Sequence, residues 1–261
     1  MTNLVAITSD RHGSKGWRLP GGFIFAAHET IVPLAGAEFA RAALEMPIAF
    51  IEVSGAYVPV GLMSPIAGRN FFIGPHGQWL GTYVPSALRA YPFALRRIDG
   101  SGEAILCVDE DSGLLTENDG TVQGFFNADG TPSEASKSIL YFLSQIERDR
   151  AATAAAVAAL RDAGVIEPWP LATRIEGQVT PLSGLYRISE AAMNALDDAA
   201  FLELRKAGAL PLAYLHLLSM IQLSVFERLN IAQQQLIRQK ENLVSLDEIF
   251  ASADSGILRF N

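Results

Sequence analysis

The segment Tyr83–Phe93, which reads YVPSALRAYPF, gathers the side chains of this chain that are best suited to binding. Arg89 lies between two tyrosines, Tyr83 and Tyr91, and Trp79 precedes them by a few residues. A guanidinium can grip a carboxylate through two parallel hydrogen bonds, and aromatic residues and arginine anchor many interfaces. The segment therefore suggests a site where Arg89 takes a carboxylate of a ligand or partner while the aromatic rings pack on its apolar groups.

A structural role for Arg89 is the alternative. Pro85 can begin a helical turn, because proline fits the first helical position, and such a turn would set Arg89 against an aromatic face. Arg89 could then pair with an acid of its own chain, for instance Glu38 or Asp109. The sequence leaves both interpretations open.

The four histidines and the single cysteine are the other side chains that could do chemistry. The histidines show no ligand spacing, and one cysteine allows neither an internal disulfide nor a cysteine-based zinc site. His76 lies in a predicted turn, whereas His216 lies on an apolar helix, where we expect a hydrogen-bonded core histidine. Both stay candidates for binding. Cys107 lies in an apolar strand, where thiols are usually inert.

Local motifs for catalysis, phosphate binding or metal binding do not occur in the sequence. The chain has no G-x-G-x-x-G, no P-loop, no G-x-S-x-G and no H-E-x-x-H. The acidic stretch Asp109–Gly120 fails as an EF-hand loop, because Gly113 falls at its fifth position and another glycine at its twelfth. We therefore expect neither a metal nor a cofactor.

The elements that must position these residues differ between the two parts of the chain. Up to about residue 130, short apolar runs bounded by turn residues predict strands at GGFIFAA, PIAFIEV, AYVPVGLM, NFFIGP and AILCVDE. The sequences NDG at 118–120 and ADG at 128–130 predict tight turns. One helix is predicted over Pro33–Leu44, where apolar residues recur at helical spacing.

Helices dominate from Thr131 onward. Thr131 is the predicted cap of a helical stretch that we expect to break near Arg150 into two helices and to stop at Gly164. The sequence GLYRI then predicts a short strand. Ser189 is expected to cap a further helix, and Gly208 to stop the one after it.

The longest helix is predicted from Pro211 to about Glu241. It is apolar all round as far as Phe226, which predicts burial. Beyond Asn230 it is polar nearly all round, so this end should project into solvent or meet a partner. The apolar part is too short and too polar to favour a membrane span, and we expect a buried helix.

The predicted fold is α+β: a β-rich half over 1–130, with short and mostly antiparallel strands, packed against a helical half over 131–241, followed by a tail over 242–261. The chain has 261 residues, 49% of them hydrophobic, which is typical of a compact protein. A net charge of −8 disfavours nucleic acid and an anionic membrane as partners. Without a predicted signal peptide, we expect a cytoplasmic protein.

Several of these segments, in this order, resemble the SapC family. The resemblance spans roughly residues 19–229 and is strongest in the region 78–93. A second matching set follows the pattern G-x-L…Y-x-H-L-x-S and consists of Gly208, Leu210, Tyr214, His216 and Ser219. Met46 and Phe125 depart from the residues common in the family, but neither is polar, so they bear on packing only.

The resemblance implies an accessory role around surface-layer proteins and their export, or around modified peptides, since relatives tend to occur beside tryptophan halogenases, peptide-modifying dioxygenases and outer-membrane receptors. It supplies no established activity and no catalytic residues.

Three functions follow from these observations. The leading hypothesis is a non-catalytic module that binds a peptide or protein partner through the Arg89 segment. The alternative is an enzyme acting on peptides or amino-acid derivatives, with a site assembled across both halves from His76, Arg89, Asp109 and His216. The third is a scaffold that forms a homodimer through the final helix, suggested by the glutamine-rich stretch Gln233–Glu241.

Overall fold

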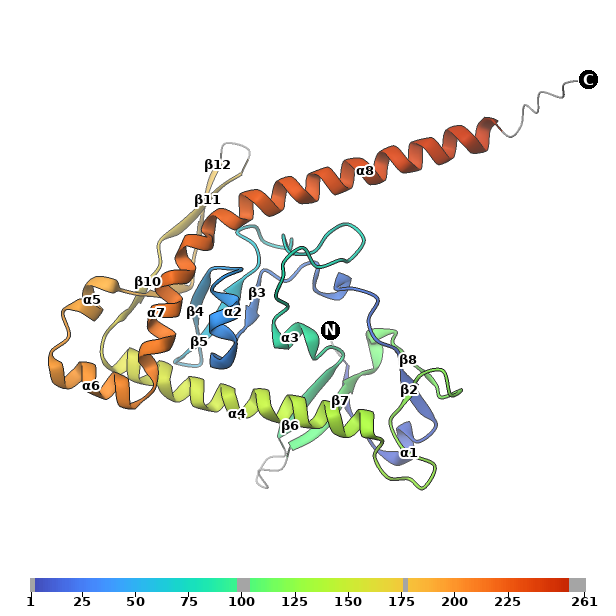
Figure 1. Ribbon diagram of the computed structural model, residues 1–261, viewed down its shortest axis with the longest axis horizontal. Coiled ribbons are helices and arrows are strands. Elements are labelled where there is room, and N and C mark those ends of the chain that lie inside the picture. Colours follow the sequence, from blue (N-terminus) through green and yellow to red (C-terminus); the bar gives the residue numbers. More distant parts are fainter. Residues whose placement is uncertain (1–2, 98–103, 176–177, 254–261) are drawn as a thin grey trace, which may run out of the picture.

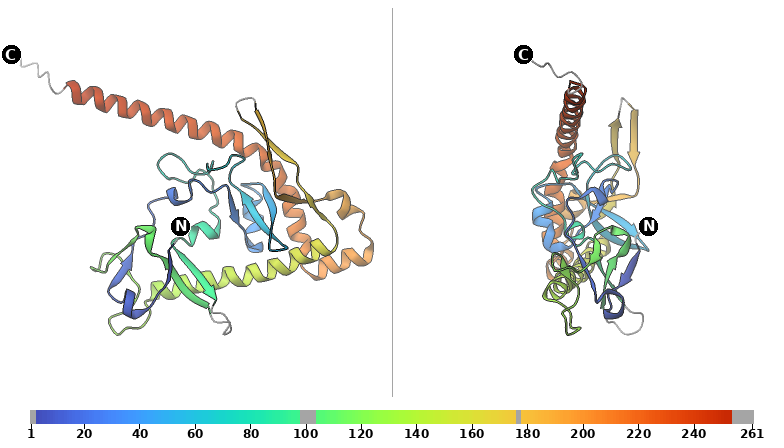
Figure 2. Two further views of the ribbon diagram at one scale, coloured as in Figure 1. Left: turned by 180° about the vertical axis from the view of Figure 1, so that it is seen from behind. Right: turned by 90° about the vertical axis from the view of Figure 1, so that its right-hand side faces the viewer.

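The structure is a computed structural model that describes residues 3–97, 104–175 and 178–253 (Figures 1 and 2). It contains 43% helix and 24% strand. The N-terminal half consists of antiparallel strands and the C-terminal half is helical, which confirms the predicted α+β fold.

The largest sheet has five antiparallel strands in the order β10-β13-β4-β5-β3. These strands are β3 (Ile31–Pro33), β4 (Ile48–Val53), β5 (Ala56–Leu62), β10 (Ile166–Pro168) and β13 (Leu185–Ile188). The predicted strands PIAFIEV and AYVPVGLM form the β4–β5 hairpin, whose two turn residues, Ser54 and Gly55, both have positive φ. Because β13 pairs with β4, one sheet joins the two halves of the chain.

Three smaller sheets complete the β structure. The first has the order β1-β7-β6, with β1 (Leu4–Ala6), β7 (Ala104–Asp109) and β6 (Phe93–Arg97). The second has the order β8-β2-β9, with β8 (Leu115–Glu117), β2 (Lys15–Trp17) and β9 (Gln123–Gly124). The third is a hairpin of β11 (Leu171–Ile175) and β12 (Gln178–Leu182). The predicted strand AILCVDE is thus confirmed as β7.

Two strand predictions for the N-terminal half are wrong, and the predicted helix is present with shorter bounds. The segment GGFIFAA forms the 3₁₀ helix η1 (Ile24–Ala26), and NFFIGP contributes only an isolated bridge between Ile73 and Trp79. Phe71 and Phe72 of NFFIGP are buried in the core, whereas Phe23 and Phe25 of GGFIFAA are partly buried and pack against it. Neither segment pairs along a strand. The helix predicted from residue 33 shrinks to η2 (Gly36–Glu38) and α2 (Phe39–Ala42), because Pro33 pairs with β5 as the end of β3.

Helix α4 (Glu134–Asp162) is continuous, so the predicted break near Arg150 is wrong. The alanine-rich sequence that follows this position has high helix propensity, and Arg150 bonds Glu147 one turn earlier. Gly164 has φ 69° beyond the last turn, as expected for a helix stop.

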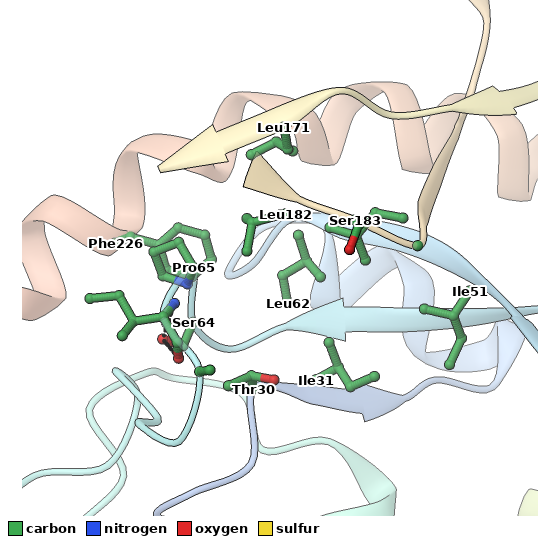
Figure 3. A pocket seen from close by; sticks show the side chains of 14 residues that line it. Thr30, Ile31, Ile51, Leu62, Ser64, Pro65, Leu171, Leu182, Ser183 and Phe226 are labelled. Carbon is green, nitrogen blue, oxygen red and sulfur yellow. Dashed lines mark hydrogen bonds between the residues drawn. The ribbon is translucent and has the colours of Figure 1, made fainter. Parts of the chain in front are cut away.

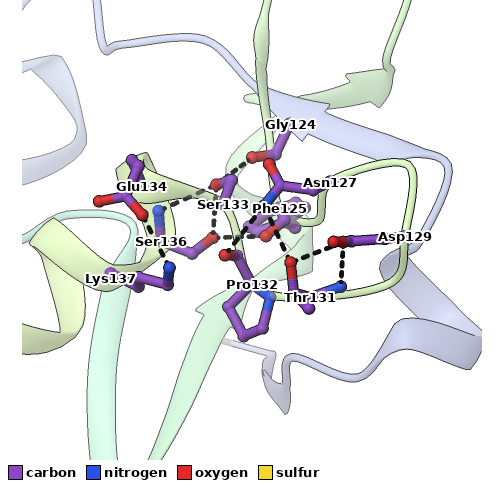
Figure 4. Close-up of polar contacts among 10 residues, drawn as sticks. All are labelled: Gly124, Phe125, Asn127, Asp129, Thr131, Pro132, Ser133, Glu134, Ser136 and Lys137. Carbon is purple, nitrogen blue, oxygen red and sulfur yellow. Dashed lines mark hydrogen bonds and ion pairs between the residues drawn. The ribbon is translucent and has the colours of Figure 1, made fainter.

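The cap of α4 also differs from the prediction, as Figure 4 shows. Ser133 is the N-cap, and its Oγ accepts a hydrogen bond of 3.1 Å from the backbone N–H of Ser136. Thr131 belongs to the preceding turn, where its N–H and hydroxyl both donate to one carboxylate oxygen of Asp129. Thr131 therefore bonds within the short Asp-Gly-Thr turn instead of capping the helix, and the N-cap lies two residues later.

The C-terminal helices are α5 (Glu190–Asn194), α6 (Asp198–Lys206), α7 (Ala209–Ser219) and α8 (Val225–Ala253), with the 3₁₀ helix η4 (Met220–Ser224) between the last two. A four-residue helix, α1 (Ser9–His12), lies near the N-terminus, and α3 (Ser86–Arg89) precedes β6. Ser189 caps α5, and Gly208 with φ 67° ends the stretch after α6, as predicted. Helix α8 projects beyond the rest of the described chain (Figure 1).

The predicted final helix needs two corrections. It starts at Ala209, is interrupted by η4 and continues to Ala253, so α8 includes the start of the predicted tail, whose remainder lies outside the described residues. It is also not buried all round, because only one side of α7 packs on the sheet and α4. Large apolar side chains on the other side are exposed: Tyr214 by 53%, Leu218 by 52% and Ile221 by 71%.

Gln233 also differs from the polar, projecting end that we predicted, since it is buried and donates to the carbonyl of Asn70. By length and composition alone, the run Ala209–Gln239 could cross a membrane, but core helices of soluble proteins meet the same criterion.

Two hydrophobic clusters form the interior. The larger one lies between the five-stranded sheet, α2, α7 and the second half of α4, and it includes Phe50 and Leu160. The smaller one contains Trp17, Phe93 and Phe125, together with residues from the first half of α4. Helix α4 therefore contacts both clusters.

Candidate functional site

The segment 83–93 forms a rigid corner before β6. Pro85 caps the short helix α3, and its carbonyl accepts the N–H groups of Leu88 and Arg89 at 3.0 and 3.1 Å. Trp79 fixes the start of the corner, because its indole N–H donates to the carbonyl of Tyr83 at 2.9 Å. The helical turn predicted at Pro85 is thus present.

In the part of the chain that the structure describes, Arg89 is held by contacts with neighbouring segments rather than by an ion pair with one of its acids. Its side chain is exposed, and its Nε donates to the carbonyl of Val84 at 3.0 Å. Its guanidinium carbon lies 5.2 Å from the ring centre of Phe142 on α4. Within the described residues, Arg89 makes no ion pair with Glu38 or Asp109, the two acids that the sequence offered as partners.

Two cavities meet at Arg89 and Phe142, and we call them together the Arg89 groove. The first, of about 460 Å³, is mainly apolar, and besides the two shared residues it is lined by Trp17, Leu19, Pro20, Ala90, Tyr91, Pro92, Phe93, Gln123, Glu134, Ala135, Ser138 and Ile139. The second, of about 500 Å³, is more polar and adds Ala35, Ala37, Glu38, Arg41, Tyr83, Ser86, Gln145, Ile146 and Asp149. The corner and α4 contribute most of the residues of this groove, and residues from 17–20 and 35–41 together with Gln123 complete its wall.

Glu38 lies buried at the base of the polar cavity and holds the corner in place. One of its oxygens accepts the Tyr83 hydroxyl and the Ser86 N–H, both at 2.6 Å. The other accepts the Ser86 hydroxyl at 2.7 Å and the Ala35 N–H at 3.0 Å. Burial, and then the Glu38 carboxylate, raise the pKa of Tyr83 well above its usual range. Tyr83 is therefore a permanent donor to Glu38.

In the polar cavity, the two arginines rather than the two carboxylates are available to bind a ligand. Arg41 and Arg89 both line it, and within the described chain neither belongs to an ion pair. Of the two carboxylates, Glu38 already has four donors and Asp149 accepts the N–H of Ala37 at 2.8 Å. The groove can therefore offer guanidinium groups to a carboxylate and an apolar surface beside them.

Tyr91 and Trp79, two more of the candidate residues, have different environments. Tyr91 lines the apolar cavity and stacks on Phe25, with ring centres 3.9 Å apart. Trp79 packs between Phe72 and Phe23 and belongs to the edge of the core, outside the groove. Its contribution to binding would be indirect, through the position of Tyr83.

The two candidate histidines lie apart from Arg89. His76 is exposed in its turn and lines a small cavity of about 220 Å³ with Tyr91. His216 is fully buried, and its Nε2 accepts the N–H of Ile188 at 3.0 Å. Burial lowers the pKa of His216 to about 4, so it is neutral at physiological pH. None of the cavities lined by Arg89 or His76 includes His216.

Asp109, the fourth residue of the assembled enzyme site, is buried and accepts the N–H of Asn3 at 2.9 Å and of Asp111 at 3.2 Å. Among the described residues, no group of three or more His, Cys, Asp or Glu side chains is arranged to hold a metal.

The sequence did not identify the α4 side of the groove. Phe142, Gln145 and Asp149 recur at three- and four-residue spacing, which places them on one helix face. This spacing was the available signal, but nothing local links it to a segment 50 residues earlier in the chain.

Comparison with protein-family models gives a match to the SapC model over residues 7–226. No curated protein and no solved structure matches the chain.

Proposed function

The chain belongs to the SapC family, whose model covers most of its length, and from this premise we propose that it is a non-catalytic module that binds a peptide or protein segment in the Arg89 groove. The observation that carries the proposal is the position of Arg89. Its guanidinium is fixed over Phe142 at the junction of an apolar and a polar cavity.

The chemistry of the two cavities defines the ligand. Arg89 and Arg41 take a carboxylate, either a side chain or the free end of a peptide, because a guanidinium presents paired donors that match its oxygens. The apolar cavity, with Tyr91 and Phe93 in its wall, accepts an adjacent apolar side chain. A peptide with an acidic group next to a large apolar residue combines both features.

A pair of synthetic peptide libraries tests this proposal. Random hexapeptides with free carboxyl ends, and the same library with amidated ends, are passed over immobilised protein, and retained peptides are identified by mass spectrometry. We expect Arg89→Ala to lose about tenfold in retention, since a hydrogen bond to a charged group contributes about 1.5 kcal/mol or more. Arg89→Lys should recover only part of it, because lysine lacks the planar fork.

The matched control is Arg205→Ala, which removes an exposed arginine from α6, outside the groove. It should retain the same peptides as the unaltered protein. If the Arg89→Ala protein folds normally and keeps its peptides in full, the proposal is wrong.

The cellular setting remains part of the proposal. Membership of the SapC family motivates the proposed accessory role around surface-protein export or peptide modification, and a cytoplasmic location is a separate part of the proposal. A homodimer through α8 is a separate proposal, motivated by the projection of this helix (Figure 2), and a monomeric mass of the full-length chain in solution would contradict it.

A further inference from the structure

A cavity of about 240 Å³, separate from the Arg89 groove, lies between the five-stranded sheet and the β11–β12 hairpin (Figure 3). Ile51 and Leu62 face it from the sheet, and Leu171 and Leu182 face it from the base of the hairpin. Phe226, at the start of α8, closes one end. None of its lining residues belongs to the Arg89 groove.

The wall of this cavity is uncharged. Its side chains are mostly aliphatic, and no Asp, Glu, Lys, Arg or His is among them. Of its three hydroxyl residues, Ser64 is already engaged, because its Oγ accepts the N–H of Ile66 and donates to the carbonyl of the same residue. The hydroxyls of Thr30 and Ser183 make no hydrogen bond to another described residue and can serve a ligand.

These features select a ligand by charge and size. A charge buried against this wall would lose its hydration without gaining a partner, which is very costly. An apolar cavity of roughly 150 Å³ accepts a benzene ring, and this one is larger by about half. The cavity is partly open to solvent, so an apolar ligand that enters it removes part of the aliphatic wall from water, which favours binding.

We propose that the cavity between the sheet and the β11–β12 hairpin binds a neutral, largely apolar group about the size of two fused rings, with one polar atom near Thr30 or Ser183. The site is independent of the Arg89 groove, and the proposal stands whether or not the groove binds peptides.

The test uses the full chain with labelled isoleucine and leucine methyl groups and two probes that share one ring system, 2-naphthol and 2-naphthoate. The neutral 2-naphthol should give saturable NMR shifts at Ile51, Leu62 and Leu182. The anionic 2-naphthoate should bind at least about tenfold more weakly, because its charge has no partner in the cavity.

Leu182→Phe fills the cavity from the hairpin side and should weaken 2-naphthol binding about tenfold or more by overpacking. The matched control, Leu202→Phe, adds the same volume on the exposed face of α6 and should leave binding unchanged. If Leu182→Phe does not fold, Leu171→Phe takes its place. An Arg89→Ala protein should still bind 2-naphthol. This result distinguishes loss of peptide binding in the groove from loss of ligand binding in this cavity.

The proposal is overturned if 2-naphthol gives no saturable shift, if the shifts lie away from these methyl groups, or if both probes bind equally. A folded cavity-filling variant that binds 2-naphthol like the unaltered protein would overturn it as well.

Discussion

The hydrogen bond between Tyr83 and Glu38 ties the corner to a segment 45 residues earlier in the chain. Replacing Tyr83 by phenylalanine keeps the ring and removes only the donor. Hydrogen bonds to charged groups contribute roughly 1.5–3 kcal/mol. Because Tyr83 is half-buried, we expect Tyr83→Phe to lower the free energy of unfolding by about 1.5 kcal/mol, near the low end of that range.

Glu38→Gln disturbs the same network from the acceptor side. Each carboxylate oxygen accepts one backbone N–H, from Ser86 or from Ala35. Whichever way the glutamine amide turns, its NH₂ group faces one of these donors, which cannot rotate away. A buried donor left unsatisfied costs about 1–3 kcal/mol, in addition to the lost charge-assisted bonds. Glu38→Gln should therefore destabilise the protein more than Tyr83→Phe does.

A double-mutant cycle joins the two substitutions. Residues in one hydrogen-bonded network couple by about 0.5–3 kcal/mol, so the double variant should lose less stability than the sum of the single variants. Urea unfolding at pH 7 measures the stability of each variant from the urea concentration at the midpoint of unfolding. The variants can be compared if the dependence of the unfolding free energy on urea concentration stays the same.

Tyr141→Phe, on a tyrosine that is 67% exposed, is the control and should be neutral. Two results would refute the reasoning: a Tyr83→Phe protein as stable as the unaltered one, or strict additivity in the cycle.

Two further predictions concern the core and a close backbone approach. Burial lowers the pKa of His216 from 6.5 to about 4. As the pH falls, the unfolded chain therefore binds the proton before the folded protein does. Protonation of this residue should lower the free energy of unfolding by about 3 kcal/mol between pH 6.5 and pH 4. Urea unfolding across this range should show a flatter profile of stability against pH for His216→Phe than for the unaltered protein; equal slopes in the two proteins would contradict the assignment. Gly16→Ala should cost about 1–3 kcal/mol, because a Cβ there would lie 2.6 Å from a backbone oxygen of β9, whereas Gly21→Ala, with nothing within 4 Å, should be neutral in the same assay.

Local signals in the sequence predicted much of the framework. The strands β4 and β5 follow from two β-rich runs in the sequence, and the structure joins them in a hairpin whose tight turn is Ser54 and Gly55. Gly164 and Gly208 mark helix ends because glycine has no Cβ and so adopts positive φ without strain. In each case the residues that determine the structure are neighbours in sequence.

The wrong predictions arise where contacts with distant parts of the chain outweigh local secondary-structure propensity. GGFIFAA has the composition of a strand, but Phe23 packs against Trp79 and Phe25 stacks on Tyr91, and this segment forms a 3₁₀ turn instead of a strand. The pairing of β13 with β4 joins residues more than 130 positions apart, and no local pattern predicts it. The predicted site lacked Phe142 because this residue is also distant in sequence from the Arg89 segment.

The continuity of α4 links these observations to function. Its first half packs Leu143 and Ile146 into the smaller cluster, and its second half packs Val157 and Leu160 into the larger one. A single helix fixes the distance between them, and with it the width of the groove between Phe142 and the corner. The position of Arg89 relative to Phe142 therefore depends on both halves of the chain packing on the same helix, so a kink introduced in the middle of α4 should weaken peptide binding even though no groove residue is changed.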